Sequence, residues 1–185
     1  MATLRPFRDY DEKDVINLFS LQTGATLPVL KGTLVKLHTT GWQSDQELEL
    51  LGHVASTNAI TNVTSQRYGI KANVDLCGAG DTPLGMLLHD VRSTDENGEL
   101  LKFNPRKAAE IEAVIEGQAV PIVTRGIFLM KDIAGSTPSV GAKLYAVASG
   151  EISTTDGGSD VEVGICLGAE ANNETLILLD INRHD

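Results

Sequence analysis

The chain has few aromatic residues and only two cysteines among its 185 residues. Aromatic residues make up 4% of it and hydrophobic residues 42%, so the core must be built from Val, Ile, Leu and Ala side chains. The two cysteines, Cys77 and Cys166, do not resemble the disulfide framework of a small secreted domain. We interpret them as small buried apolar residues rather than as a disulfide bridge.

Long apolar runs and an excess of basic charge are also missing. The first residues lack the apolar core of a secretory signal, and no apolar run approaches the ~20 residues that cross a bilayer. The formal net charge is −10, with no basic stripe to attract phosphate groups. We therefore expect synthesis in a cytoplasm, and partners that are neither nucleic acid nor membrane.

No pattern of residues predicts a catalytic, metal or cofactor site. The segment 156–160 lacks the ligand series and closing glutamate of a calcium loop, and 78–80 lacks the following Lys-Ser/Thr of a phosphate loop. Paired catalytic carboxylates are not positioned by any motif. The histidines do not stand at the spacing of a metal-ligand pair on one strand or helix: they are His38, His53, His89 and His184. We expect no enzyme, metal or cofactor.

What the chain does contain is a repeated phrase, in which a basic residue and a glycine precede an apolar strand. It occurs at 31–37 and 125–131, and a similar phrase spans 141–147. Glycine permits a sharp turn, and the apolar run behind it favours a buried sheet surface. Several such phrases in a chain with 18 glycines predict a mainly β domain, a barrel or sandwich with little helix.

Alternation and turn spacing predict about ten short strands. Asn97-Gly98 predicts a two-residue hairpin tip between 85–92 and 99–103, because both residues tolerate positive φ. A short helix is predicted at 45–51 and a helical turn at 105–109. The complete set of predicted strands is 27–37, 68–76, 85–92, 99–103, 110–116, 119–123, 127–130, 144–148, 161–167 and 175–181.

Residues 1–28 form a predicted N-terminal arm, and 29–185 the body, with 43–64 as a peripheral insertion rich in Ser, Thr and Asn. Acidic and basic residues are mixed along the arm, and apolar and aromatic residues lie between them. Termini are loose unless they dock, so these anchors predict docking onto the same chain or onto a neighbour. The residues that we single out for such contacts are Phe7, Arg8, Tyr10, Phe19 and Leu21.

Two further segments are candidate binding features. The segment 81–87 is an unusual passage into a strand, whose plain interpretation is a turn that feeds the core. The segment 104–107 places Arg106 and Lys107 together on an acidic protein. Such a cluster is either solvated surface or a contact for an acidic patch on a partner, where it sets register and association rate.

A series of short phrases spans nearly the whole chain in order. Together they resemble the small capsid decoration, or cement, proteins of tailed bacteriophages. No single phrase is specific, and the resemblance rests on the set. The phrases are 5–19, 31–35, 83–86, 90–92, 96–99, 105–110, 117–121, 124–126, 141–145 and 163–165.

The resemblance implies a β-barrel or β-tulip body with an extended N-terminal arm, located on the outer surface of the virion head. It implies a structural protein that bridges major capsid subunits, self-associates as a trimer or a dimer, and has no catalytic residues. The arm is then expected to pair with a strand edge of the capsid subunit. The implied capsid-binding residues are Phe7, Arg8, Tyr10, Phe19, Leu21, Arg106 and Lys107.

Two other functions remain open at this point. The first is a protein-binding adaptor in a phage tail or baseplate, which differs from a capsid protein only in its partner. The second is a barrel enzyme that acts on a small molecule or sugar and needs a pocket with convergent polar groups. His89, Asp90 and Arg92 are its best candidates, but strand alternation puts His89 on the opposite face from the other two.

Overall fold

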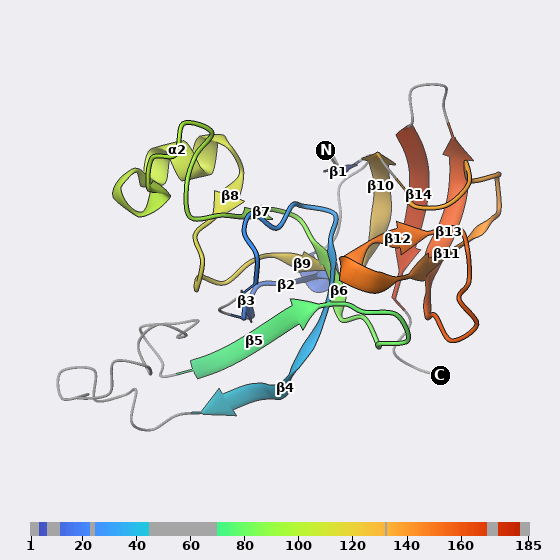
Figure 1. The fold of residues 1–185 in the computed structure, drawn as a ribbon, viewed down its shortest axis with the longest axis horizontal. Helices are drawn as coiled ribbons and strands as arrows, with labels where there is room; N and C mark the ends of the chain where they lie inside the picture. Colours follow the sequence, from blue (N-terminus) through green and yellow to red (C-terminus); the bar gives the residue numbers. More distant parts are fainter. Residues whose placement is uncertain are drawn as a thin grey trace.

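The computed structural model of the chain describes residues 4–6, 12–22, 25–44, 70–131, 133–169 and 174–181. It confirms a mainly β fold with little helix, in which a sheet curls into a half-barrel. Figure 1 shows two sheets that meet near the middle of the molecule, with a small helical lobe at one end. The short 45–51 helix and most of the 43–64 insertion fall outside the described residues.

Sheet A contains the C-terminal strands and is antiparallel throughout. Its order is β1-β10-β14-β13-β11-β12. Because β1 lies at one edge, the start of the chain joins strands from its far end. The strands are β1 (Leu4–Pro6), β10 (Arg125–Lys131), β11 (Lys143–Ala146), β12 (Ile152–Ser153), β13 (Glu162–Ala169) and β14 (Glu174–Asp180).

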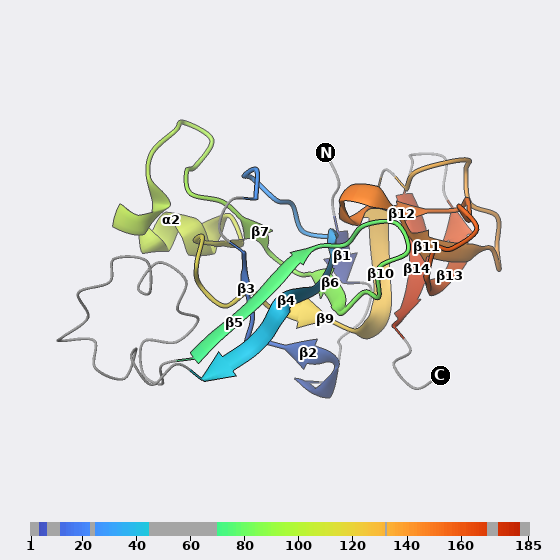
Figure 2. The same ribbon diagram turned by 60° about the horizontal axis from the view of Figure 1, so that its bottom comes forward.

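Sheet B has the order β2-β9-β6-β4-β5-β3 and is antiparallel except where β3 runs parallel to β5. Its two long strands, β4 and β5, form a ribbon that projects away from the body (Figures 1 and 2). A short helical turn, η1 (Glu12–Asp14), leads into its first strand. The strands are β2 (Val15–Ile16), β3 (Ser20–Leu21), β4 (Leu34–Ser44), β5 (Ile70–Leu76), β6 (Gly85–Leu87) and β9 (Ile122–Val123).

The helical lobe spans residues 90–114, and we call it the lobe below. It begins and ends with two short parallel strands, β7 (Asp90–Val91) and β8 (Ala113–Val114). Between them lie a 3-10 turn, η3 (Leu101–Phe103), and one α-helix, α2 (Pro105–Glu110). Asn104 separates the turn from the helix, and its side chain accepts a hydrogen bond from the Lys107 N–H at 3.2 Å. This is an N-cap, and Pro105 follows it where a missing N–H costs nothing.

Two apolar clusters hold the body together. The first joins the sheets, because Leu34, Met86 and Val123 of sheet B pack with Phe128 and Ile177 of sheet A. The second lies under sheet B and under the strand that begins the lobe. Its buried members are Phe19, Leu21, Val29, Val35, Ala72, Val74, Leu84, Leu87, Val91, Val120 and Ile122.

The 3-10 turn η4 (Ala148–Gly150) locks sheet A against sheet B. The Gly150 N–H donates to the Cys77 carbonyl at 2.7 Å, and the Cys77 N–H donates to the Leu34 carbonyl at 3.0 Å. Gly150 has φ +73°, and a Cβ placed there would lie 2.5 Å from the Leu34 carbonyl oxygen. Only glycine permits both this conformation and this approach.

Most predicted strands of the C-terminal half are confirmed with shifted ends. The predictions at 127–130, 144–148, 161–167 and 175–181 correspond to β10, β11, β13 and β14. The prediction at 68–76 corresponds to β5. The 27–37 strand is wrong in extent, since the chain turns at Lys31-Gly32 and the strand begins at Leu34. The cause is a hydrogen bond that the Lys31 N–H donates to the Asp90 carboxylate at 2.8 Å.

The predictions inside the lobe need larger corrections. The 105–109 helical turn is confirmed, but the 110–116 strand is wrong in extent, because helix α2 runs to Glu110 and only Ala113–Val114 is strand. The 99–103 strand is also wrong, since 101–103 is the turn η3. Helix propensity and the Asn104 cap outweighed an alternation of only a few residues.

The predicted hairpin turn at Asn97-Gly98 is one residue longer than expected. The Gly98 N–H donates to the Asp95 carbonyl, the Asp95 N–H donates to the Glu99 carbonyl, and only one bridge, Thr94 to Leu100, follows. Gly98 alone has positive φ, at +84°. This is a three-residue loop with a glycine bulge rather than a two-residue tip. The Asp95 carboxylate decides the difference, because it accepts the N–H groups of both Asn97 and Glu99 at 2.8 Å.

The strands in the described parts of residues 1–28 belong to the two sheets. Strand β1 pairs with β10, β2 with β9, and β3 with β5. Leu4, Phe19 and Leu21 are buried in the apolar clusters. Of the two alternatives that the sequence left open for the arm, these segments dock onto the same chain. The division of the chain at residue 28 stays a prediction.

Candidate partner-binding surface

The lobe carries an exposed apolar and basic knob. Phe103 is 77% exposed at the end of η3, and Leu100 is 44% exposed just before it. The Lys102 ammonium lies 4.9 Å from the centroid of the Phe103 ring, within the range of a cation–π contact. An exposed phenylalanine beside cations is unusual on an acidic protein that has only four phenylalanines.

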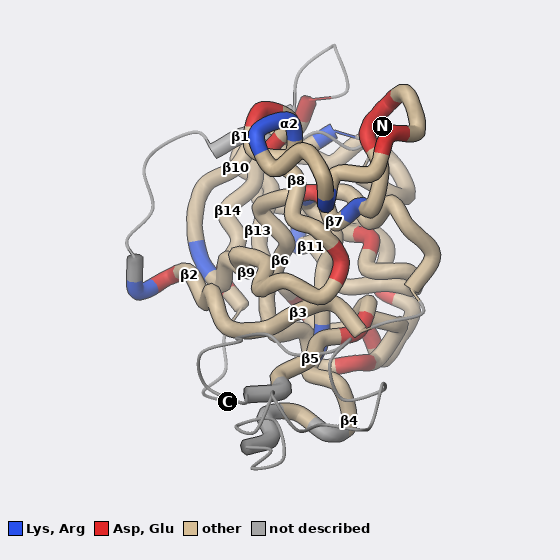
Figure 3. Tube along the Cα trace, turned by 90° about the vertical axis from the view of Figure 1, so that its left-hand side faces the viewer, with Lys and Arg blue, Asp and Glu red and all other residues tan. Residues whose placement is uncertain are grey.

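Helix α2 continues this knob with its two basic residues. Arg106 is 90% exposed and forms an ion pair with Glu110, one turn along the helix, at 3.3 Å. Lys107 is partly buried at the same end of the lobe. Figure 3 shows the basic segment of α2 facing the viewer, with an acidic segment directly beside it and others elsewhere on that side. We define the basic knob as Leu100, Lys102, Phe103, Arg106 and Lys107.

An ion pair and several hydrogen bonds hold the lobe in a fixed orientation on the body. The Lys31 ammonium pairs with Glu112 at 2.7 Å, and the Lys31 N–H binds Asp90. The hydrogen bond from Lys31 lowers the pKa of the Glu112 carboxyl, against the opposing effect of its partial burial. Val29 and Val91 exchange backbone hydrogen bonds at 2.9 and 2.7 Å. The knob is therefore presented on an anchored support.

The predicted contact residues are not gathered at one surface. Arg106 and Lys107 lie together on the basic knob. Phe19 and Leu21 are 9% and 2% exposed and pack in the second cluster, so their apolar surface is used inside this chain. Phe7, Arg8 and Tyr10 lie outside the described residues.

Sequence reasoning missed the three knob residues that precede the helix. The sequence predicted a strand at 99–103, and nothing in that prediction singled out Leu100, Lys102 or Phe103 as contact residues. The available signal was Asn104-Pro105, because an Asn before a proline begins a helix and ends a preceding strand. That signal places Phe103 in a short turn, where nothing obliges it to point inward.

A second surface feature is an open groove beside strand β4. It encloses about 500 Å³ and has Leu37, Pro83 and Leu84 among its lining residues. Its charged residues pair with each other, since the Lys36 ammonium lies 2.7 Å from Asp81 Oδ2. The segment 81–87 that drew attention in the sequence is a turn that feeds the core strand β6, as its plain interpretation had it.

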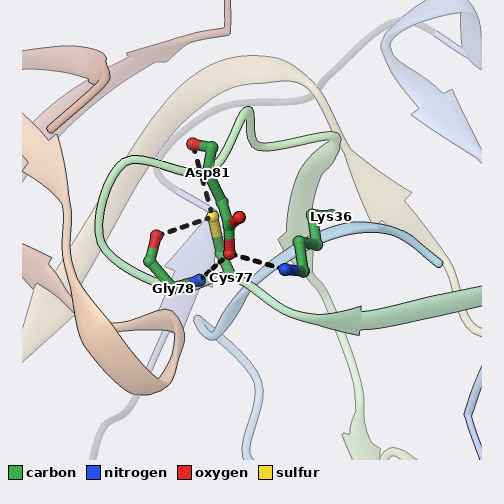
Figure 4. Close-up of polar contacts among 4 residues, drawn as sticks. All are labelled: Lys36, Cys77, Gly78 and Asp81. Atoms are coloured by element: carbon green, nitrogen blue, oxygen red, sulfur yellow. Dashed lines mark hydrogen bonds and ion pairs between the residues drawn. The ribbon is translucent and has the colours of Figure 1, made fainter. Parts of the chain in front are cut away.

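Asp81 is the hub of a small polar cluster at this groove (Figure 4). The same Oδ2 atom also accepts the Gly78 N–H at 2.7 Å. The hydrogen bond from Lys36, followed by that from Gly78, lowers the pKa of the Asp81 carboxyl. The same bond to Asp81 raises the pKa of the Lys36 ammonium. The pair fastens the 78–84 loop to β4.

Cys77 lies beneath this cluster and is fully buried. Burial, and then the nearby Asp81 carboxylate, raise the pKa of the Cys77 thiol to about 11. A thiol with such a pKa stays protonated near neutral pH and is a poor nucleophile. Cys166 is also buried and free, which confirms the interpretation of both cysteines as small core residues.

The enzyme candidates His89, Asp90 and Arg92 lie in and beside the short strand β7. Asp90 is engaged by the Lys31 N–H, and strand β7 comprises only Asp90–Val91, so the alternation argument has little strand to act on. Within the described ranges, no three His, Cys, Asp or Glu side chains gather as they would around a metal ion. None of the helices in the described part of the chain has the length and hydropathy needed to cross a membrane.

Comparison with known families and proteins gives one match. Residues 108–181 match the family model described as phage cement protein, which confirms the predicted resemblance over this part of the chain. The match runs from helix α2 through β14 and so includes five of the six strands of sheet A. No curated protein and no solved structure matches. The family match supports a capsid-associated structural protein at a virion location.

Proposed function

We propose that this protein binds the outer surface of an assembled phage head and stabilises the shell by bridging neighbouring major capsid subunits. The cement-family match over residues 108–181 supports a capsid role. The observation that carries the contact itself is the basic knob, because an exposed aromatic ring flanked by cations suits a partner with an apolar pocket and an acidic rim.

The proposed mechanism is physical rather than chemical. Packaged DNA presses outward on a thin shell, and the bonds between capsid subunits resist that pressure. A protein that spans two subunits adds contact area that exists only when both are in the lattice. Many modest contacts then sum over the shell through multivalency. We also propose self-association as a trimer or a dimer, which increases the number of subunits that each assembly can bridge.

In this proposal the arm has a different role from the capsid contact that was expected from the sequence. Leu4, Phe19 and Leu21 pack within this chain, so deleting residues 2–21 is expected to lower stability first. Loss of head binding in such a truncation would then follow from unfolding. The knob gives a cleaner test, because its residues contribute little to the core.

The test uses heads that lack this protein, mixed with purified chain and inspected by electron microscopy for occupancy. Phe103→Ser should weaken head binding by roughly ten-fold or more, because an aromatic anchor is typical of binding hot spots. Arg106→Gln with Lys107→Gln should also weaken head binding, because the two substitutions remove an electrostatic attraction. The difference from the wild type should grow as the salt concentration is lowered, since screening is then weaker. Both variants should melt like the wild type.

A matched control separates local from global charge effects. Thr137→Glu with Ser139→Glu also changes the net charge by −2, on an exposed loop away from the knob. It should bind heads normally. If the knob variants decorate heads at full occupancy, the knob is not the capsid contact. If the wild type decorates tails instead of heads in purified virions, the adaptor alternative is correct.

A further inference from the structure

The outer face of sheet A is apolar although it is not part of either core cluster. An antiparallel sheet with one face in water normally alternates apolar and polar residues. In strand β14 the inward residues Ile177 and Leu179 are buried, yet the outward residues Leu176 and Leu178 are apolar as well. A strand that is apolar on both faces is typical of a sheet covered on both faces.

The same pattern continues across neighbouring strands in register. Ile127 of β10 stands opposite Leu178, and Leu129 stands opposite Leu176. Leu178 also stands opposite Ile165 of β13. These five side chains are partly exposed, and neither cluster includes them or has them packed against it. They form a continuous aliphatic patch, which we call the outer patch.

Charged pairs of opposite sign close the ends of the outer patch. Arg125 and Asp180 are register partners at one end, with 3.9 Å between Nε and Oδ1. Lys131 and Glu174 are partners at the other end, at 3.3 Å. Toward β11 the row ends at Lys143, which pairs with Glu162 at 2.6 Å. An apolar centre inside a polar rim is the anatomy of a protein interface.

The charge balance of this rim suits a second copy of the same chain. The chain has a net charge of −10, so two copies repel each other over most of their surfaces. Each rim pair contains one cation and one anion, so this face can meet a copy of itself without net repulsion. In a two-fold contact, the Arg125–Asp180 end of one copy can lie against the Lys131–Glu174 end of the other, with opposite charges facing.

We propose that a second copy of this chain packs on the outer patch, face to face. This inference deepens the self-association in the proposed function and rests on it for its biological setting. Two sheets that pack in this way interdigitate their side chains across about 10 Å, as in a β-sandwich.

The size of the patch predicts the strength of the contact. Three strands of about five residues each cover roughly 14 Å by 17 Å, given the usual strand spacing and rise. That footprint, roughly 240 Å² on each copy, is well below the ~800 Å² per partner of a standard interface. Association should therefore be weak and depend on concentration, with dissociation in the micromolar to millimolar range rather than a permanent dimer.

The test is sedimentation of the purified full-length chain over a wide concentration range, without capsids. Leu178→Lys puts an unpaired charge at the centre of the patch and should weaken self-association at least ten-fold. Leu37→Lys is the matched control, because it makes the same change at an exposed strand leucine of sheet B, outside both the outer patch and the basic knob. It should leave self-association unchanged.

A second measurement on the wild type does not depend on a variant that folds. Isotope-labelled and unlabelled copies are mixed and treated with a lysine-reactive cross-linker, and links between copies are identified by mass. Lys131 and Lys143 at the rim should form such links. A wild-type chain that stays monomeric at high concentration, or an oligomer that links copies only through Lys102 and Lys107, would overturn the inference.

Head binding distinguishes this inference from the proposed function. If Leu178→Lys is monomeric in solution and still binds heads, the outer patch is the self-contact and the capsid role stands. If the wild type self-associates through the patch but never decorates heads, the inference stands and the proposed function fails. If the wild type is monomeric and Leu178→Lys loses head binding, the patch faces a capsid subunit, and the inference is wrong.

Discussion

The lobe and sheet A lie at opposite ends of the molecule (Figure 1) and are held together by different forces. Sheet A is built on buried aliphatic side chains that alternate along long strands, such as Ile177 and Leu179. The lobe has strands of two residues and depends on backbone N–H groups that donate to the side chains of Asp90, Asp95 and Asn104. Sheet A should therefore control global stability, and the lobe should respond locally.

The surfaces of these two regions also differ in kind. The lobe presents a basic, projecting knob, and sheet A presents a flat, apolar and charge-balanced face. A knob with cations suits an acidic partner, whereas a balanced face suits a copy of the same acidic chain. The two ends can thus serve the two proposed contacts at once.

The largest expected effect tests the inward face of sheet A against its outward face. Ile177→Ala should cost about 2–5 kcal/mol of unfolding free energy, because it leaves a cavity in the cluster that joins the sheets. Leu178→Ala, the next residue on the other face, should cost about 1 kcal/mol or less in the monomer. Urea unfolding at low protein concentration measures both. Equal losses would mean that the outer patch is part of the core.

The next effect concerns the junction between the two sheets. Gly150→Ala should cost about 1–3 kcal/mol, because the residue has φ +73° and its Cβ would meet the Leu34 carbonyl oxygen. Gly141→Ala is the control, since Gly141 has φ +80° but nothing lies within 4 Å of its Cβ. The difference between the two melting temperatures isolates the close approach from the backbone strain. If both variants lose the same stability, the junction contact is unimportant.

A smaller effect is expected in the lobe. Gly98→Val should destabilise by on the order of 1 kcal/mol, because valine is strained at φ +84° although space around it is open. Hydrogen exchange should show the loss in residues 93–104 rather than in sheet A. Protection that falls equally across both regions would show that the lobe and body unfold as one unit.

The smallest effect is a pH dependence at the Lys36–Asp81 pair. The folded pKa of Asp81 is lowered, so the pair contributes stability above the carboxyl's unfolded pKa and loses it as pH falls through the folded value. The pKa of Lys36 is raised, so its contribution is lost only as pH rises through that high value. Asp81→Asn should flatten the acid side of the stability profile. An acid limb identical to that of the wild type would contradict this.

The sequence predicted the regions where many signals agree. Strands β10, β13 and β14 are long runs with clear turns around them, and both cysteines lie where small apolar residues are expected. The lobe was predicted poorly because its elements are too short for periodicity to decide. There a single carboxylate, Asp95, and a single cap, Asn104, set the backbone, and such local bonds outweigh a pattern of three or four residues.

The residues of the candidate surfaces also differ in whether the sequence alone could identify them. Arg106 and Lys107 were identified from charge alone, because two adjacent cations are conspicuous on an acidic chain. Phe103 was missed, because exposure depends on what packs nearby. The arm residues Phe19 and Leu21 were chosen as anchors for an apolar surface. That property is equally satisfied inside the chain, where the second cluster receives them.

The sequence by itself determined a mainly β fold, an acidic surface and a resemblance to cement proteins. These follow from composition, from the alternation of apolar and polar residues, and from the order of short motifs, all of which are properties of the linear sequence. Only the tertiary structure decided that the described arm segments close the two sheets and that the outer patch lies on one face. Pairing across more than a hundred residues, as between β1 and β10, depends on register and packing, and no local pattern encodes them.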